Sequence, residues 1–470
     1  MQNSEIQRVY QAQLSNRWNV SQSSAAERIA KLKRLKAAIL RRQVELQEAI
    51  RADFSKSPVE TDITEVFPVI SEINHTIRHL KKWMKPKRVG SPFALTGTRS
   101  QVRCEAKGLV LVLSPWNYPF QLFANPIVTA VAAGNVVIAK PSSKVPKTSE
   151  FMKSLFAEIF AENEVAVILG SAAVSDQLLD MKFDHIFFTG SPSIGKKVMA
   201  AASKHLTPVT LELGGKSPAI VDQTADVKKA ASRILWGKFI NAGQTCVAPD
   251  YLLIHRSQEA AFIEEARKVV ASRYGKDDAE IAQAQDFCRL VSEGHQQELK
   301  KLLDESLAAG ARIAFGGRTD RSQRYLSPTL LTGVTESSPV MRGEIFGPIL
   351  PVLTYDDDHQ LLRIIQNQEK PLAFYLFSRN NTQIEKILRN STAGGTCINS
   401  VVIHLANHNL PFGGVGNSGM GAYHGYFGFR ALSHERAVLR QGMLDLVRFF
   451  YPPYTNFVRS FVRLVTRHLA

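Results

Sequence analysis

The sequence predicts an α/β fold with parallel sheets, because short apolar runs rich in β-branched residues alternate with helical patterns. The predicted strands of the first half are GLVLVLSP (108–115), NVVIAKPS (135–142), EVAVILG (164–170), HIFFTGS (185–191) and PVTLELGG (208–215). Helical patterns at 120–133, 147–161 and 193–203 separate several of them. From about residue 214 the alternation starts again, which predicts a second α/β domain.

The segment before the first strand is helical in pattern over 21–52 and roughly over 59–83. Ser23 and Ser24 can cap the first helix, and apolar residues follow at three- and four-residue spacings. Basic residues fill the other face, at Arg28, Lys31, Lys33, Arg34, Lys36, Arg41 and Arg42. A solvated face of an amphipathic helix explains this charge more simply than a binding patch does.

The second half repeats the strand pattern and ends in a glycine-rich loop. Its predicted strands are AIVD (219–222), YLLIH (251–255), LPVLTY (350–355), PLAFYLFS (371–378) and GTCINS (395–400). We expect the stretch 410–425, LPFGGVGNSGMGAYHG, to be an ordered loop.

Composition limits the class of protein. The chain has 470 residues, of which 44% are hydrophobic and 21% charged, as in soluble globular proteins with two or three domains. Its formal net charge of +16 favours an anionic partner such as a membrane surface or an anionic cofactor. No zinc-finger or RNP-like signature is present, so we expect no nucleic-acid partner.

The cysteines and the N-terminus indicate a cytoplasmic protein. The four cysteines, Cys104, Cys246, Cys288 and Cys397, lie far apart without a CxxC pair, which argues against a zinc site and a disulfide framework. We therefore predict no metal and a reducing compartment. The start, MQNSEIQRVY, has no apolar signal core, and no stretch reaches the ~18 apolar residues that suggest a spanning helix.

Candidate site residues follow the predicted strands. Parallel sheets bind ligands beyond the carboxyl ends of their strands, where this chain carries Asn117, Lys140, Gly190 with Ser191, and Glu212. The run GSPSIG (190–195) could bring backbone N–H groups to a phosphate, although a plain strand–turn–helix junction fits equally well.

Two of these side chains have simpler interpretations. A lysine at position 140 could bind a ribose hydroxyl or simply be solvated. Burial would raise the pKa of Glu212 and suit a general base, but Glu212 could also cap the next helix.

Cys246 lies in NAGQTCVAP (241–249), and three roles are open to it: inert packing residue, metal ligand or nucleophile. A nucleophilic thiol needs a setting that favours the thiolate, and usually a base. No local Cys–His signature is visible, so a glutamate acting through water is the other candidate base. Alone, the cysteine would be assigned to packing.

The motifs taken together resemble the aldehyde dehydrogenase superfamily. They are SPWNYP (114–119), AKPS (139–142), FTGS (188–191), LELGGKSP (211–218), GQTC (243–246), EIFGP (344–348), EKPLAFYLFS (369–378) and PFGGVGNSGMG (411–421). They occur in the family's order and spacing, over roughly residues 20 to 453. GQTCVAPDY, EKPLAFYLFS and YHGYFGFRALSHER look most like the class 3 branch, which includes fatty aldehyde dehydrogenases.

The resemblance implies NAD(P)-dependent oxidation of aldehydes to carboxylic acids. Cys246 matches the nucleophile, which forms a thiohemiacetal and then a thioester. Asn117 matches the side chain that holds the oxyanion together with the Cys246 backbone N–H, and Glu212 matches the base that activates water. Tyr118 is expected in the substrate pocket. Medium- or long-chain aliphatic and aromatic aldehydes are the favoured substrates.

The resemblance also implies cofactor contacts for NAD or NADP. Glu344 matches the residue that grips the nicotinamide ribose, Phe346 the side chain beside that ring, and Lys140 the contact to the adenosine ribose. Gly190, Ser191 and Gly195 match the pyrophosphate turn.

Two positions depart from the family pattern. Many NAD-preferring relatives carry a glutamate where this chain has Ser143, followed by Lys144. A carboxylate would repel a 2′-phosphate and an ammonium would attract it, so NADP should be accepted alongside NAD; neutral drift at Ser143 is the alternative. Ser400 replaces a frequent aspartate near the expected substrate loop and leaves the details of the pocket open.

The C-terminal tail is basic and amphipathic. Arg459, Arg463 and Arg467 recur every four residues and share one helical face. Apolar residues lie mainly elsewhere around the helix, at Phe457, Phe461, Leu464, Val465 and Leu469. Residues 456–470 could lie on an anionic membrane at the inner face of the cell. Docking on a partner subunit or over the substrate mouth is the alternative.

We predict the following organisation: an NAD(P)-binding domain from 1–84 and 107–212, a catalytic domain at 213–395, a bridging element from 85–106 and 396–428, and a C-terminal segment at 429–470. The bridging element is expected to pair subunits in a homodimer. Two other functions are considered: an acylating enzyme that passes the thioester to coenzyme A, and a non-catalytic protein on the same scaffold. Glu212 argues against the first, because an intact base favours water, and retention of Asn117, Glu212, Cys246 and Glu344 argues against the second.

Overall fold

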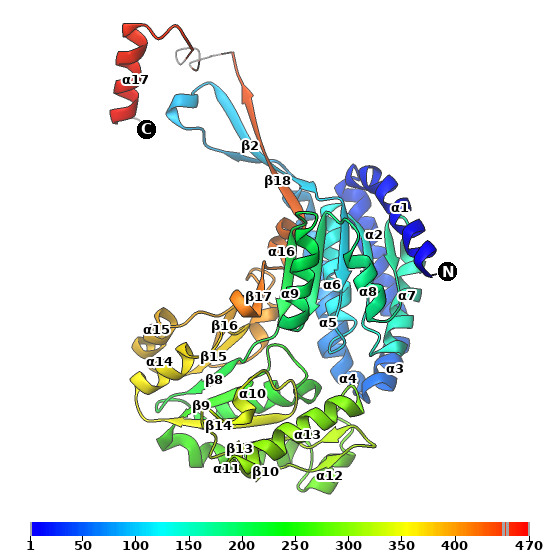
Figure 1. Cartoon of the computed structure of the whole chain (residues 1–470), viewed down its shortest axis with the longest axis vertical. Coiled ribbons are helices and arrows are strands. Elements are labelled where there is room, and N and C mark those ends of the chain that lie inside the picture. Colours follow the sequence, from blue (N-terminus) through cyan, green and yellow to red (C-terminus); the bar gives the residue numbers. More distant parts are fainter. Residues whose placement is uncertain (1, 444–446, 448–450, 469–470) are drawn as a thin grey trace.

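Two sheets with helices on their faces form the body of the molecule, and a narrow three-stranded arm projects from it (Figure 1). The structure is a computed structural model that describes residues 2–443, 447 and 451–468. The α/β class predicted from alternating strands and helices is confirmed.

The first sheet has six strands in the order β17-β7-β6-β3-β4-β5. Their bounds are Leu109–Leu113 (β3), Val136–Lys140 (β4), Val165–Val167 (β5), His185–Gly190 (β6), Val209–Leu213 (β7) and Gly419–Met420 (β17). β3 to β7 run parallel, and β17 pairs antiparallel with β7. Five predicted strands of the first half therefore occur where the apolar runs place them.

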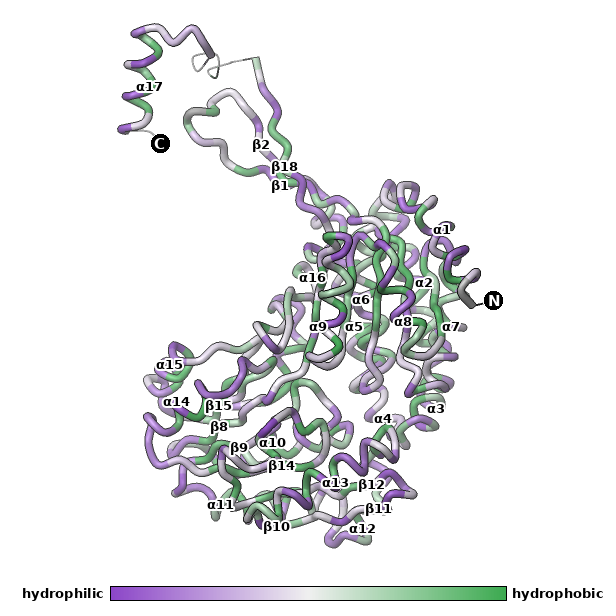
Figure 2. The backbone as a smooth tube through the Cα atoms, in the orientation of Figure 1, coloured by the Kyte–Doolittle hydropathy of each residue, from purple (hydrophilic) through white to green (hydrophobic). Residues whose placement is uncertain are grey.

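Successive side chains of these strands pack in two different hydrophobic cores, because the residues of a strand alternate between the two faces of a sheet. Val110 and Val112 of β3 pack in one core with α2, α3, α5, α6 and α7. Leu109, Leu111 and Leu113 pack in the other, with α1, α8 and α9. Figure 2 shows the hydrophobic segments concentrated in the body of the molecule. Coverage of both faces explains why these strands read as continuous apolar runs.

The helices of this unit begin at the N-terminus. Their bounds are Gln2–Ser21 (α1), Ala25–Arg41 (α2), Gln43–Phe54 (α3), Pro58–Thr61 (α4), Phe67–Trp83 (α5), Gln121–Ala133 (α6), Pro146–Ile159 (α7), Ala172–Leu179 (α8) and Pro192–Ser203 (α9). Ser24 caps α2 in a capping box with Glu27. One π-helical turn, Asp62–Val66, joins α4 to α5.

The predicted helix over 21–52 is in fact two helices that break at Arg42. Arg28, which was assigned to the solvated basic face, is buried and donates hydrogen bonds to the carbonyls of Ala132 and Ser21. The prediction for Arg28 was wrong, because the guanidinium finds backbone acceptors that are remote in sequence or outside the helix.

The second sheet has seven strands in the order β10-β13-β14-β9-β8-β15-β16. Their bounds are Pro218–Val221 (β8), Tyr251–His255 (β9), Arg312–Phe315 (β10), Thr329–Thr332 (β13), Ile349–Tyr355 (β14), Ala373–Phe377 (β15) and Gly395–Ile398 (β16). All neighbours are parallel except β10 and β13. Its helices are Val227–Phe239 (α10), Glu259–Arg273 (α11), Asp278–Gln283 (α12), Glu293–Ala308 (α13), Asp358–Gln366 (α14) and Asn381–Arg389 (α15). A two-stranded hairpin, Thr319–Asp320 (β11) and Tyr325–Leu326 (β12), completes the unit.

The arm consists of Lys87–Val89 (β1), Thr98–Ala106 (β2) and Ser433–Gln441 (β18), all antiparallel. The helix Gly425–Ala431 (α16) leads into β18, and Asn456–His468 (α17) lies beside the tip of the arm (Figure 1). The second arm segment is thus 433–441, whereas 396–428 was expected. Residues 395–398 and 419–420 instead extend the two body sheets through backbone hydrogen bonds. The domain boundaries otherwise stay a prediction.

None of the helices in the described part of the chain is long and apolar enough to cross a membrane.

Candidate active site

The loop that carries Cys246 is a tight left-handed turn after α10. Asn241, Ala242 and Gly243 have φ values of 54°, 50° and 74°. Asparagine and glycine tolerate this region, and a Cβ at position 243 would lie 2.2 Å from the carbonyl oxygen of Gly347. The NAGQTC sequence therefore folds sharply and presents Cys246 at a fixed place.

The Asn117 loop is tied to this turn by hydrogen bonds. The Asn117 Nδ2 donates to the carbonyl of Gln244 at 3.1 Å, and the Asn241 Nδ2 donates to the carbonyl of Asn117 at 2.8 Å. The Tyr118 hydroxyl lies 2.6 Å from the Thr245 Oγ1. These contacts bring the two loops together at the junction of the two sheets.

A cavity of about 290 Å³ opens beside Cys246. Tyr118, which is expected in the substrate pocket, lines it together with Thr245. The remaining wall is mostly apolar and includes Ile63, Phe67, Leu122, Trp236, Ile240, Val402, Ile403, Leu405 and Phe412. Ser400 is not among the lining residues. Such a wall suits an apolar ligand.

Glu212 lies in β7, and its carboxylate is buried without a hydrogen-bond partner among the described residues. It therefore does not cap a helix, the alternative considered from the sequence. Burial raises the pKa of Glu212 well above its usual value, because a carboxylate loses hydration there. A buried carboxyl free of partners can exchange a proton with a small molecule that reaches it.

Burial also raises the pKa of the Cys246 thiol, and the nearby carboxylates of Glu344 and Glu212 raise it further. The resting side chain is a neutral thiol, so it needs a base or an added positive charge to react.

The turn after β6 has features that fit the phosphates of a dinucleotide. Ser191 caps α9 and accepts from the Ile194 N–H, which leaves the start of α9 facing the strand end. A Cβ at Gly195 would lie 2.8 Å from a Leu213 methyl carbon, and one at Gly190 would lie 2.5 Å from the Phe188 ring. Only glycine allows these close approaches.

The neighbouring strand end carries the remaining predicted contacts on this side. Lys140 is buried at the end of β4, and burial lowers its pKa. Ser143 and Lys144 follow it and are exposed, with the Lys144 Nζ 5.4 Å from the centre of the Trp116 ring.

Glu344 and Phe346 occupy the loop before β14. The Glu344 carboxylate packs directly against Gly214. A Cβ added at position 214 would lie 1.8 Å from the Glu344 Oε2. Burial raises the pKa of Glu344 to about 8. The Phe346 ring packs edge-on to Trp116, with ring centres 5.3 Å apart.

Several supporting residues could not be found from sequence. Lys216 forms an ion pair of 2.7 Å with Asp250 and donates to the carbonyl of Gly343, while the Ile345 N–H donates to Asp250. His295 approaches the carbonyl of Phe346 at 2.9 Å. These contacts fix the loop that carries Glu344. Lys216 and Asp250 belong to conspicuous motifs, but nothing local indicates their partners.

A second group supports the Asn117 loop from below. Lys56 is fully buried, 3.4 Å from Glu65 Oε1 and 4.7 Å from the centre of the Tyr118 ring. The other Glu65 oxygen accepts from the N–H groups of Phe120 and Gln121, at the start of α6. We call Lys56 and Glu65 the buried pair.

Comparison with known proteins identifies the family of the chain. The chain matches the aldehyde dehydrogenase family over residues 1–438. It is 40% identical over 447 residues to aldehyde dehydrogenase family 3 member B1 of Rattus norvegicus, covering 94% of each chain. It is 41% identical over 428 residues to a dimeric NADP-preferring aldehyde dehydrogenase of the same species, covering 91% of this chain and 93% of that protein.

A solved structure has the same fold. A substrate-bound state of Staphylococcus aureus AldH superposes with a TM-score of 0.92 at 40% identity, over 97% of this chain and 99% of that one. The fold and the sequence match thus define an oxidoreductase of the aldehyde dehydrogenase family, and the chain belongs to it. Within that family it is an NAD(P)-dependent aldehyde dehydrogenase of the class 3-like branch.

Proposed function

We propose that Cys246, Asn117 and Glu212 carry out the oxidation. The observation that carries this assignment is the convergence of the Cys246 and Asn117 loops on one apolar cavity, beside a partnerless buried carboxyl group.

The chemistry follows from these groups. The Cys246 thiol releases its proton to solvent water, the sulfur attacks the aldehyde carbon, and the carbonyl oxygen becomes an oxyanion held by the Asn117 amide and the Cys246 backbone N–H. NAD(P)⁺ supplies a hydride acceptor when bound. Loss of the hydride leaves a thioester on Cys246. Glu212 takes a proton from water, the resulting hydroxide attacks the thioester carbon, and the thiolate leaves with release of the carboxylic acid.

The cofactor contacts are proposed from the same arrangement. Gly190, Ser191 and Gly195 would face the pyrophosphate at the start of α9. Lys140 would bind the adenosine ribose, Glu344 would accept hydrogen bonds from the nicotinamide ribose, and Phe346 would pack beside that ring. The close glycine approaches and the fixed Glu344 loop support this fit.

A panel of aldehydes with NAD⁺ and NADP⁺ tests the assignment through absorbance of the reduced cofactor. We expect acid production with apolar medium- or long-chain aliphatic or aromatic aldehydes, which the apolar cavity wall supports. Cys246→Ala should abolish turnover, whereas Cys104→Ala, on the arm strand β2, should leave it unchanged. Activity retained in Cys246→Ala would refute the proposal.

Coenzyme A transfer is the alternative fate of the thioester. The unpaired Glu212 carboxyl favours water as the acceptor. Glu212→Gln should accumulate acyl-enzyme that hydroxylamine releases, and added coenzyme A should not speed turnover of the unaltered enzyme. Acceleration by coenzyme A would favour the alternative.

Acceptance of NADP is proposed from Ser143 and Lys144, which are both exposed after β4. Ser143→Glu should lower kcat/KM for NADP by about tenfold or more relative to NAD, because a carboxylate repels the 2′-phosphate. An NADP value for the unaltered enzyme below about a hundredth of its NAD value would contradict the proposal.

The arm and the tail are proposed as contact surfaces. The exposed strands β1 and β18, with Leu439 half exposed, support pairing of arms in a homodimer. In α17, exposed Phe457 and Leu464 and the three arginines support peripheral binding to an anionic membrane from the cytoplasm. Leu469 lies outside the described residues. Deleting 456–470 should release the protein from anionic vesicles, and unchanged co-sedimentation would refute this.

A further inference from the structure

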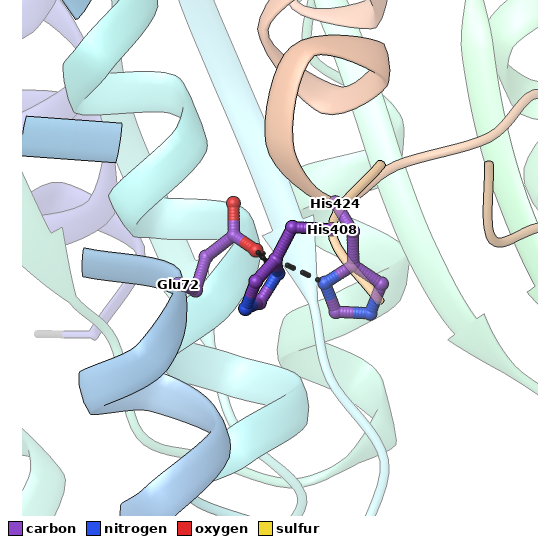
Figure 3. Close-up of side chains that lie close together, drawn as sticks. All are labelled: Glu72, His408 and His424. Carbon is purple, nitrogen blue, oxygen red and sulfur yellow. Dashed lines mark hydrogen bonds and ion pairs between the residues drawn. The ribbon is translucent and has the colours of Figure 1, made fainter. Parts of the chain in front are cut away.

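Three polar side chains from distant parts of the chain meet at the wall of the substrate cavity (Figure 3). Glu72 lies on α5, His408 in the loop before Phe412, and His424 directly before α16. The Glu72 Oε2 is 2.8 Å from the His408 Nδ1 and 3.3 Å from the His424 Nδ1. All three ligand atoms lie within 4.8 Å of one another.

We propose that Glu72, His408 and His424 form a binding site for a divalent transition metal, with Zn²⁺ as the ion that this donor set fits. Two imidazoles and one carboxylate are a recurrent set of three protein ligands for zinc, with a fourth position left for water or another donor. The predicted absence of a metal rested on the spacing of the cysteines, and it did not consider these residues.

Glu72 and His408 form a close contact, with the Glu72 Oε2 2.8 Å from the His408 Nδ1. An imidazole nitrogen and a carboxylate oxygen come this close when a positive charge lies between them, either a proton on the imidazole or a metal ion. A shared cation meets this need without a linear N–H···O alignment.

The atoms that face away from the cluster are held as in a metal centre. The Glu72 Oε1 accepts from the Gly425 N–H at 2.9 Å, and the His408 Nε2 lies 2.9 Å from the Ser71 Oγ. Ligating histidines typically hydrogen-bond through their second nitrogen, which fixes the ring. The ligands are therefore oriented before an ion arrives.

Burial and access are also consistent with a metal. Glu72 is 1% exposed and His424 is 3% exposed, so water does not solvate the negative charge of the Glu72 carboxylate. Its ion-pair partners among the described residues are the two histidines. His408, His424 and Ser71 line the cavity beside Cys246, which gives an ion a route to the cluster.

Titration of the chelator-treated full chain with Zn²⁺ by calorimetry tests the proposal. The Cys246→Ala background prevents ligation by the cavity thiol. We expect one equivalent of Zn²⁺ to bind, and Co²⁺ in its place to give the visible absorption of a low-coordinate site. Absence of stoichiometric Zn²⁺ uptake would show that the cluster is held by hydrogen bonds alone and would overturn the proposal.

Variants locate the ion. Glu72→Gln and His424→Gln should abolish binding, and Ser71→Ala should weaken it by about 10- to 100-fold. His75→Gln is the matched control, because the centre of the His75 ring lies 5.0 Å from that of the His408 ring but His75 is not one of the three proposed ligands. Unchanged binding in Ser71→Ala, Glu72→Gln and His424→Gln would overturn the assignment; if a ligand variant does not fold, Ser71→Ala decides. These readouts do not depend on aldehyde oxidation.

Discussion

The thiol of Cys246 has acidic neighbours, which distinguishes it from cysteines activated by a positive charge. Because burial, Glu344 and Glu212 raise its pKa, little thiolate exists near neutral pH in the free enzyme. We expect the rate of Cys246 alkylation by iodoacetamide to rise continuously from about pH 7 to about pH 9. Glu212→Gln should increase this rate at each pH. A plateau below neutral pH would contradict the prediction.

Glu344 should make cofactor binding depend on pH. Its pKa of about 8 means that the carboxyl is largely protonated at neutral pH and ionises as the pH rises through that value. The ionised form accepts stronger, charge-assisted hydrogen bonds from ribose hydroxyls, and both of its oxygens can accept. The Kd for NAD(P)⁺, measured by quenching of protein fluorescence, should therefore fall as the pH rises through about 8. In Glu344→Gln the curve should lose this step; a step that remains would assign it to another group.

Asn117 should affect turnover more than binding. Loss of one oxyanion donor lowers kcat by about 10²- to 10³-fold. Asn117→Ala should show this loss in steady-state kinetics, with KM for the aldehyde changed far less. An equal effect on kcat and on cofactor Kd would instead indicate collapse of the loop that Asn117 shares with Gln244.

At this scale the sequence predicted the residues that lie in motifs and missed those that act across the fold. Cys246 and Asn117 were predicted as site residues because their motifs occur in family order. His295 and Lys56 were not, since each acts on a loop more than fifty positions away. His408 and Glu72 were missed for the same reason.

Among the elements, the π-helical turn and the segment between α3 and α4 support α6 through the buried pair. Lys56→Met leaves the Glu65 carboxylate buried without its cation, and burial already raises the pKa of Glu65 to about 7. Loss of one partner of a buried ion pair costs about 3–5 kcal/mol. The free energy of unfolding, measured in urea, should fall by that amount.

The matched control is the surface pair Arg256 and Asp356, whose side chains are 58% and 55% exposed. Arg256→Met should cost less than about 1 kcal/mol. Equal losses for the two variants would mean that the buried pair has no special role.

Element types followed the hydrophobic pattern, whereas their ends and partners did not. Most body strands were predicted because both of their faces are buried, which leaves a continuous apolar signal, but β10, β13 and β17 were not predicted. α1 and β18 gave no such signal. The strand β18, SHERAVLRQ, is largely exposed, and its pairing with β2 is a contact between residues more than 300 positions apart.

For the whole molecule, the arm should determine the oligomeric state. Removing residues 433–470 deletes β18 and leaves the arm with β1 and β2 alone. We expect light scattering to find a dimer for the full chain and a monomer for this truncation. Removing only 456–470 is the control and should leave the dimer intact. A dimeric 433–470 truncation would locate the interface elsewhere.

The six-stranded sheet and its helices are completed by residues near the C-terminus of the polypeptide. β17 adds to β7, and the Asn135 side chain, which follows α6, donates to the carbonyl of Leu432. Ribosomes release the N-terminus first, so helices α1 to α9 emerge long before these last strands exist. This unit cannot complete its fold until synthesis is nearly finished, and part of its apolar surface stays uncovered until then. Because of this topology, the nascent chain needs protection by chaperones during translation.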